Sequence, residues 1–239
     1  ATRTDGGWLL NGQKIWSSRA PFGERGFGLF RSDPAAQRHQ GLTYLMFDLH
    51  TDGVTVRPIQ QLGGETGFGE IFLDDVFVAD TDVIGDVGDG WRAAMSTASN
   101  ERGMSLRSPA RFAAPTQRLV EMWKANPDSA FADEVADAWI KAQAYRLHTF
   151  GTVTRLAEGG ELGAEASVTK VFWSDLDVAI HQTACDLRGA DGELRDSWND
   201  GLLFALGGPI YAGTNEIQRN IIAERLLGLP RESSGVKRS

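Results

Sequence analysis

The 239-residue chain carries 24 Lys and Arg against 32 Asp and Glu. Its net charge of −8, with the basic residues scattered, excludes the cationic surface that nucleic acid or anionic lipid would need. Cys185 is the only cysteine, which excludes an internal disulfide and a multi-cysteine metal site and favours a reducing, cytoplasmic compartment. No apolar stretch approaches the roughly 20 residues that cross a bilayer, so we expect no membrane span.

The first third of the chain has the pattern of β structure. This pattern begins within a few residues of Ala1, and because no initiator methionine precedes it, we expect a fragment or a processed product. Asn11-Gly12 separates two apolar runs and tolerates positive φ angles, which predicts a hairpin turn. Further strands, rich in aromatic and branched residues, are predicted at Phe27–Arg31, Leu42–Leu49, Val54–Ile59 and Glu70–Val78. Together they predict an antiparallel, β-barrel-like domain over residues 1–84.

Three glycines within residues 85–90 mark a loop and a domain boundary, because helical periodicity dominates afterwards. The helices are predicted at Trp91–Leu106, Ala113–Lys124, Ala130–Glu158, Leu162–Leu187 and Asn215–Leu227. In the third helix, the apolar stripe that should face a core comprises Val135, Ala138, Trp139, Ala142, Tyr145 and Leu147. The predicted fold class is therefore α+β, with the β domain followed by an all-α four-helix bundle over residues 85–239.

Several kinds of reaction site are not supported by the sequence. The four histidines lack the paired spacing of zinc ligands, so no metal site is predicted. No Gly-x-Ser-x-Gly nucleophile elbow is present. The glycine-rich segments at residues 63–64 and 85–90 fit neither a phosphate-binding loop nor a dinucleotide fingerprint, because neither joins a strand to a helix with the required spacing.

The most informative segment is Gly207–Gly228, where a glycine-rich turn enters a helix beginning Thr214-Asn215. Backbone N–H groups at such a turn can face an anionic or carbonyl oxygen, although physical reasoning alone favours a capped helix without a ligand. The segment closely resembles the C-terminal signature of acyl-CoA dehydrogenases. Four other segments resemble the same family in the same order, and they are Asn11–Ser18, Gly41–Tyr44, Glu70–Val76 and Gly85–Trp91.

The resemblance implies a middle β domain and a C-terminal four-helix bundle with FAD bound between them. It also implies an N-terminal helical domain, which we expect to be missing from this sequence. It also implies the reaction, in which the α carbon of an acyl-CoA thioester loses a proton and the β carbon transfers hydride to the flavin N5. The implied setting is fatty acid β-oxidation, with electron-transfer flavoprotein as the acceptor. A homo- or hetero-oligomer, either dimer or tetramer, is implied as well, whereas the acyl chain is not identified.

The family's commonest catalytic base is a glutamate directly before the Gly-Thr of the signature, but Ala212 occupies that position here. A second family pattern places the base on an early helix of the C-terminal domain, and Asn100-Glu101-Arg102 matches it. Glu101 is therefore the candidate base, although a solvated glutamate paired with a neighbouring arginine is the alternative. The resemblance implies that the backbone N–H of Ala212 binds the thioester oxygen. The expected substrate contacts are Arg102, Tyr211 and Gly213.

For the cofactor, the resemblance implies that Trp16 stacks near the flavin ring and that Ser18 hydrogen-bonds near N5, although a core tryptophan is the alternative for Trp16. Thr214 and Glu216 match positions that contact FAD. The adenosine half is less well matched, because the family's Arg-x-Thr-Phe-Gly run is missing and its Gln-Gly-Gly segment reads Asp186–Ala190.

Three other functions stay open. The chain could be a non-catalytic subunit that completes another chain's FAD site. It could instead be an acyl-CoA oxidase or flavin monooxygenase on the same fold, because oxygen access depends on pocket packing. The third alternative is a binding module without enzymatic activity.

Overall fold

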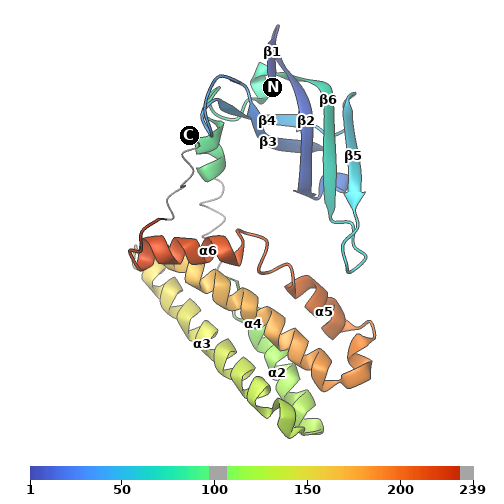
Figure 1. Cartoon of the computed structure of the whole chain (residues 1–239), viewed down its shortest axis with the longest axis vertical. Coiled ribbons are helices and arrows are strands. Elements are labelled where there is room, and N and C mark those ends of the chain that lie inside the picture. The colour runs from blue at the N-terminus through green and yellow to red at the C-terminus, as the bar shows by residue number, and fades with distance from the viewer. Residues whose placement is uncertain (97–106, 232–239) are drawn as a thin grey trace, which may run out of the picture. The chain divides into compact units, whose positions relative to one another are not determined.

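The computed structural model describes residues 1–96 and 107–231 (Figure 1). The chain forms two compact units, Ala1–Asn100 and Glu101–Ser239. The loop predicted as the boundary belongs to the first unit, because Gly88 N–H donates to Thr43 Oγ1 at 2.9 Å and Asp89 bridges to Leu42. The helical turn at residues 90–96 follows this loop directly.

The first unit is an antiparallel β domain, as expected, but its described strands form two sheets rather than a closed barrel. Four strands form one sheet in the order β1 (Thr2–Thr4), β2 (Gly7–Ser18), β6 (Phe68–Ala79) and β5 (Val54–Ile59). The second sheet contains only β3 (Arg25–Arg31) and β4 (Leu42–Asp48). The two sheets share one apolar core, to which β2 contributes Leu10, β4 contributes Leu45 and β6 contributes Val76, all fully buried.

The hairpin predicted at Asn11-Gly12 is wrong, because β2 runs straight through these residues. They form an irregularity in its pairing with β6, where the register shifts between Leu10 and Gly12. The Asn11 amide donates to Asp75 Oδ1 at 2.7 Å and accepts from the Asp75 N–H at 3.0 Å. Asn-Gly suits a bulge as well as a turn, and only the partner strand distinguishes the two.

The second unit is helical. Its helices are α2 (Ala110–Ala125), α3 (Ala132–Ala157), α4 (Glu165–Leu187), α5 (Ser197–Ala205) and α6 (Asn215–Ile221), the last continued by a π-helical turn at Ile222–Leu226. Helix α5 was not predicted, since Gly201 lies within it. That glycine is required by close packing, because a Cβ there would lie 2.4 Å from the His181 ring. The side chain of Asp196 starts α5 by accepting from the N–H groups of Trp198 and Asn199.

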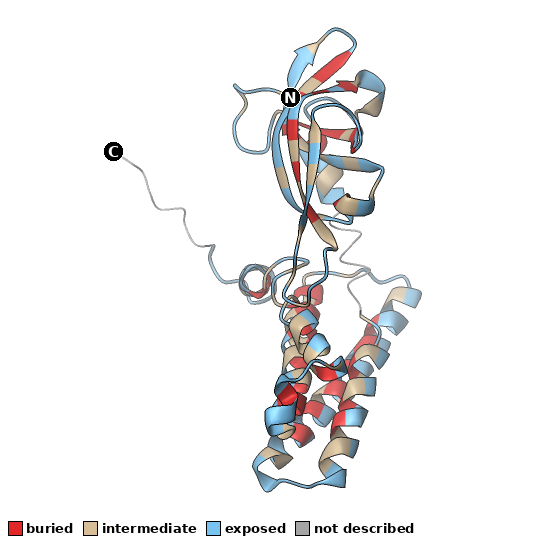
Figure 2. Cartoon of the chain, turned by 90° about the vertical axis from the view of Figure 1, so that its right-hand side faces the viewer, coloured by how far each residue is buried: buried red, intermediate tan, exposed pale blue. Residues whose placement is uncertain are grey.

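The core of the helical unit lies between α2, α3 and α4, and Figure 2 shows buried residues along the faces where these helices meet. It is built around Phe112, Trp173 and Ile180, none of which is exposed. The predicted stripe of α3 is only partly correct, since Trp139 is 48% and Leu147 is 64% exposed. Helix α3 contacts both α2 and α4, and these two residues are not among those it buries. The buried members of the stripe are Val135, Ala138, Ala142 and Tyr145.

Candidate functional site

The residues between α5 and α6 form a loop, and the last four of them, Tyr211–Thr214, are here called the signature turn. Ala212 and Gly213 both have positive φ angles, 55° and 85°. Two successive left-handed residues turn the chain sharply and leave Ala212 exposed. Among the residues that the structure describes, no acceptor receives the backbone N–H of Ala212. The turn therefore presents a free backbone donor at its surface.

The end of the signature turn is closed by helix-capping contacts. Thr214 Oγ1 accepts from the N–H of Ile217 at 3.3 Å, which is the N-cap interaction of α6. The side chain of Gln218 returns to the turn, donating from Nε2 to the carbonyl oxygens of Ala212 and Gly213 at 3.3 and 3.4 Å. Both carbonyls thus point toward the helix, while the Ala212 N–H stays free.

Glu216 takes part in the same cap. Its pKa is lowered first by its own backbone N–H and next by the Thr214 hydroxyl, which donates to the carboxylate. Thr214 and Glu216 were expected to contact FAD, and in the structure their side chains bind one another at the start of α6. Contact with the cofactor stays a prediction for both.

Tyr211 packs into the edge of the helical core rather than standing free. Its ring lies 6.0 Å from the ring of Trp173, and the guanidinium of Arg107 lies over it at 5.6 Å. The Tyr211 hydroxyl is buried, with no hydrogen-bond partner among the described residues. This packing fixes the first residue of the signature turn. Substrate contact by Tyr211 and Gly213 stays a prediction.

In the β domain, Trp16 stands at a second irregularity of the β2–β6 pairing, between Lys14 and Ser17. Its φ angle is 57°, and its side chain is 59% exposed. The ring of Phe68 meets it edge-on with centroids 5.9 Å apart, so a face of the indole remains accessible. The core alternative for Trp16 is therefore wrong. Ser18, two residues later, is also exposed.

This geometry fits a flavin, because a planar ring system can stack on an exposed indole and a nearby hydroxyl can bind a ring nitrogen. Trp16 and Ser18 belong to the first unit and the signature turn to the second, and each is described within its own unit. Glu101 and Arg102 lie outside the described residues.

The altered segment Asp186–Ala190 is engaged within its own unit. Arg188 forms an ion pair with Asp196 at 2.9 Å. The amide of Gln182 donates to Asp186 Oδ1 at 2.8 Å. The charged side chains that replace the family's Gln-Gly-Gly are thus already paired.

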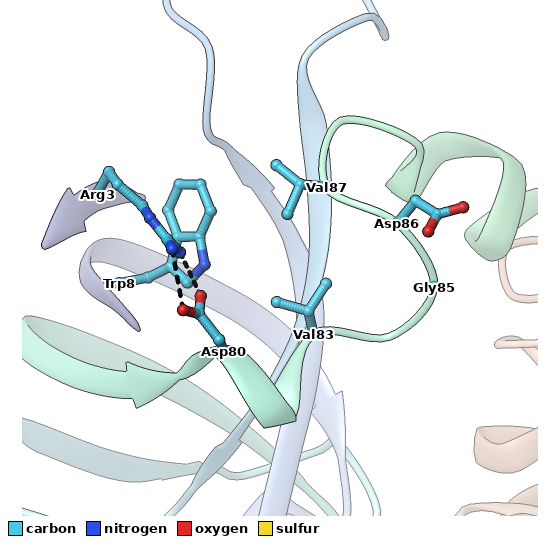
Figure 3. Close-up of a pocket in the computed structure, with 7 residues that line it drawn as sticks. All are labelled: Arg3, Trp8, Asp80, Val83, Gly85, Asp86 and Val87. Carbon is cyan, nitrogen blue, oxygen red and sulfur yellow. Dashed lines mark hydrogen bonds and ion pairs between the residues drawn. The ribbon is translucent and has the colours of Figure 1, made fainter. Parts of the chain in front are cut away.

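A hollow on the β domain is lined by none of the predicted site residues (Figure 3). Arg3 and Asp80 form an ion pair across it, and the Arg3 guanidinium lies 4.9 Å from the centre of the Trp8 ring. The charged groups of Arg3 and Asp80 are thus already paired with each other, so we assign the hollow no ligand. The remaining lining residues are Val83, Gly85, Asp86 and Val87.

Residues 1–96 and 107–231 contain no cluster of three His, Cys, Asp or Glu side chains that could hold a metal ion. No helix among them has the length and apolar character needed to cross a membrane.

Comparison with known proteins gives consistent results. Residues 1–76 match the family description "Acyl-CoA dehydrogenase, middle domain", and residues 88–227 match "Acyl-CoA dehydrogenase, C-terminal domain". The acyl-CoA dehydrogenase IpdE1 of Mycolicibacterium smegmatis is 39% identical over 238 residues, covering 95% of this chain and 59% of its own length. The chain therefore spans about three fifths of that relative.

Two solved structures share the fold. The structure described as the Tcur3481-Tcur3483 steroid ACAD has a TM-score of 0.88 at 22% identity, covering 97% of this chain and 63% of its own. The ChsE4-ChsE5 complex from Mycobacterium tuberculosis has a TM-score of 0.84 at 23% identity, covering 97% and 64%. With both halves matched in order, the chain belongs to the acyl-CoA dehydrogenase family and comprises its middle and C-terminal domains.

Proposed function

We propose that this protein takes part in FAD-dependent α,β-dehydrogenation of an acyl-CoA thioester. The observation that carries the proposal is the free N–H of Ala212, presented by a turn whose sequence matches the family signature. An α proton of a thioester is only weakly acidic, so its removal requires a donor at the carbonyl oxygen where negative charge develops. A backbone N–H supplies such a donor whatever side chain the residue carries.

The base is proposed to be Glu101. Ala212 has no side-chain carboxylate, so the base must come from another part of the chain, and a glutamate at the start of the helical domain matches the second family pattern. In this arrangement the Ala212 N–H binds the thioester oxygen while the Glu101 carboxylate takes the α proton. Arg102 is proposed to contact the substrate beside it.

The cofactor is proposed to be FAD, with Trp16 stacking on the flavin and Ser18 binding near its N5. When bound, FAD accepts the β hydride. Thr214 and Glu216 are proposed contacts on the side of the signature turn. Electron-transfer flavoprotein is the proposed acceptor of the electrons.

The substrate and assembly are proposed from the relatives. One similar structure is titled a steroid ACAD, which favours a steroid-derived acyl-CoA over a straight fatty acyl chain. That structure and the ChsE4-ChsE5 complex each name two chains, which favours assembly with an unlike subunit.

A second candidate function is that of a partner subunit which completes another chain's FAD site. The internal pairing of Arg188 with Asp196 favours it, because this segment then has fewer groups free to hold an adenosine diphosphate. The two functions differ in one respect, since only the first requires Glu101 to act as a base.

The test uses the full-length protein, with an unlike subunit if one co-purifies, and compares wild type with Glu101→Gln. The matched control is Glu134→Gln, an exposed glutamate in the first turn of α3. Each protein is mixed anaerobically with fatty and steroid-derived acyl-CoAs, and bleaching of the flavin absorbance is followed. We expect bleaching by wild type and by the control, and loss of most of it in Glu101→Gln. Equal bleaching by all three would refute Glu101 as the base, and a flavin-loaded wild type that never bleaches would favour the partner-subunit function.

A further inference from the structure

Lys170 on α4 forms a hydrogen bond with the residue that follows the signature turn. Lys170 is only 3% exposed, and its Nζ donates to Asn215 Oδ1 at 2.7 Å. Asn215 is the first residue of α6 and follows the turn directly. The hydroxyl of Ser174, one helical turn after Lys170, shares its proton between the same oxygen at 3.1 Å and the Val171 carbonyl at 3.0 Å. Two side chains of helix α4 therefore donate to Asn215, the residue directly after the turn.

Asn215 uses its remaining polar groups in the same place. Its Nδ2 donates to Asp175 Oδ1 at 2.9 Å, and its backbone N–H donates to the Pro209 carbonyl at 2.8 Å. The latter bond closes the loop that contains Tyr211, Ala212 and Gly213. Asn215 is only 2% exposed, so its bonds to Lys170 and Ser174 are shielded from water. The geometry of the turn thus depends on the position of one amide group.

A buried lysine is an unusual means of holding a helix in place. Burial lowers the pKa of Lys170, and the carboxylates of Asp175 and Glu216 oppose this shift. An apolar residue of similar volume would fill the same space without loss of hydration, and such replacements are often neutral or stabilising. Fold stability alone therefore does not explain the ammonium group. What the ammonium supplies is a charge-assisted hydrogen bond with a defined direction, which an apolar residue lacks.

We propose that Lys170 is a positioning residue, which acts through Asn215 to hold the signature turn so that the Ala212 N–H faces the thioester oxygen. This inference rests on the proposed dehydrogenation. Lys170 lies beneath the turn and does not touch the substrate. Its contribution is to restrict the orientation of a donor, and misplacing a donor by about 1 Å is enough to slow a reaction substantially.

The test separates orientation from folding. Lys170→Met keeps most of the length of the unbranched side chain and removes the donor. Lys141→Met is the matched control, because the Lys141 side chain is 45% exposed and forms an ion pair with Asp137 on the same helix, α3. Ser174→Ala removes the Ser174 donor and keeps the Lys170 donor to Asn215. It is the variant to measure if Lys170→Met folds poorly. All are made in the full-length, FAD-loaded protein.

Two readouts are used. The first is exchange of the α protons of a bound 3-thiaacyl-CoA with D₂O, followed by NMR. Sulfur replaces the β carbon in this ligand, so proton removal is observed without hydride transfer. The second is amide hydrogen exchange of Tyr211 and Asn215, whose N–H groups donate to the carbonyls of Gly207 and Pro209 and so protect the two ends of the turn. We expect Lys170→Met to slow α-proton exchange roughly tenfold and to speed the exchange of these two amides to a similar degree. Ligand affinity should change less than about twofold, because ground-state binding is retained.

The outcomes are distinguishable. If wild type exchanges the α protons and Lys170→Met matches both wild type and Lys141→Met, the positioning role is refuted while the proposed function stands. A lower melting temperature with unchanged exchange at a fixed lower temperature would refute it equally, since a structural role alone has that effect. If wild type neither exchanges the α protons nor bleaches with any acyl-CoA, the proposed function fails and the positioning role fails with it.

Discussion

Substitution of Gly213 by alanine should destabilise the helical unit more than the same substitution at Gly228. Both glycines have positive φ angles, 85° and 67°, so alanine meets a similar backbone penalty of about 1–2 kcal/mol at each. At Gly228 an added Cβ has no atom within 4 Å, whereas at Gly213 it would lie 2.4 Å from Gln218 Nε2. The two sites therefore differ in the displacement of one buried side chain.

The magnitude of that difference follows from what Gln218 loses. Its side chain is only 7% exposed, and its amide donates to the two carbonyls of the turn. Moving the amide leaves the buried Nε2 group of Gln218 without its two acceptors, which costs about 1–3 kcal/mol. We expect Gly228→Ala to lose about 1–2 kcal/mol of unfolding free energy. Gly213→Ala should lose about 1–3 kcal/mol more.

Urea unfolding followed by circular dichroism at 222 nm measures both losses in the helical unit. A double-mutant cycle tests the cause, because in a Gln218→Ala background the side chain that blocks Cβ is absent. There Gly213→Ala should lose no more than Gly228→Ala. Equal losses for the two glycine variants in the wild-type background would refute the steric argument, and a Gly213→Ala loss unchanged by Gln218→Ala would refute the role of Gln218.

Three further predictions follow from other contacts. Trp16→Ala should weaken FAD binding roughly tenfold in titrations of the apoprotein while changing its stability little, because the exposed indole is proposed to stack on the flavin. Arg111→Ala should lower the unfolding free energy by about 3 kcal/mol. The Asp177 carboxylate, which is 1% exposed, would lose the Arg111 guanidinium that lies 2.9 Å from it. A loss below about 1 kcal/mol in urea unfolding would contradict this. The pKa of Asp196 is held below its ordinary 3.8, chiefly by the N–H of Asn199. The ionised carboxylate therefore stabilises the fold fully at pH values above 3.8, and this stabilisation is lost as the pH falls through the lowered pKa. Asp196→Asn should therefore show a weaker loss of stability between pH 5 and 2.

The elements with long, regular patterns were predictable from the sequence. Helices α3 and α4 have apolar residues at helical spacing over many turns, and both were predicted close to their observed bounds. Helix α5 has nine residues and an internal glycine, so its pattern is too short to recognise. Asn11-Gly12 was misread because turn and bulge use the same residues. The choice between them depends on Asp75, which is 64 positions away.

For the candidate site, the motif resemblance proposes residues and not geometry. Trp16 and Ala212 are proposed site residues, whereas their positive φ angles, 57° and 55°, could not be read from the sequence. Lys170 was not recognised at all. A single lysine in a helix gives no signal of its own, and its partner Asn215 lies 45 residues further along the chain.

A free backbone donor at a tight turn requires a strained backbone, and contacts around the signature turn stabilise that backbone. Left-handed geometry at Ala212 opposes the turn by about 1–2 kcal/mol, so the turn persists only because other contacts outweigh this strain. Those contacts come from the Gln218 amide and from Lys170 acting through Asn215. Since none of these three side chains is proposed to touch the substrate, their substitution should alter proton removal more than substrate affinity. That pattern would distinguish a preorganised turn from one that forms only when the substrate binds.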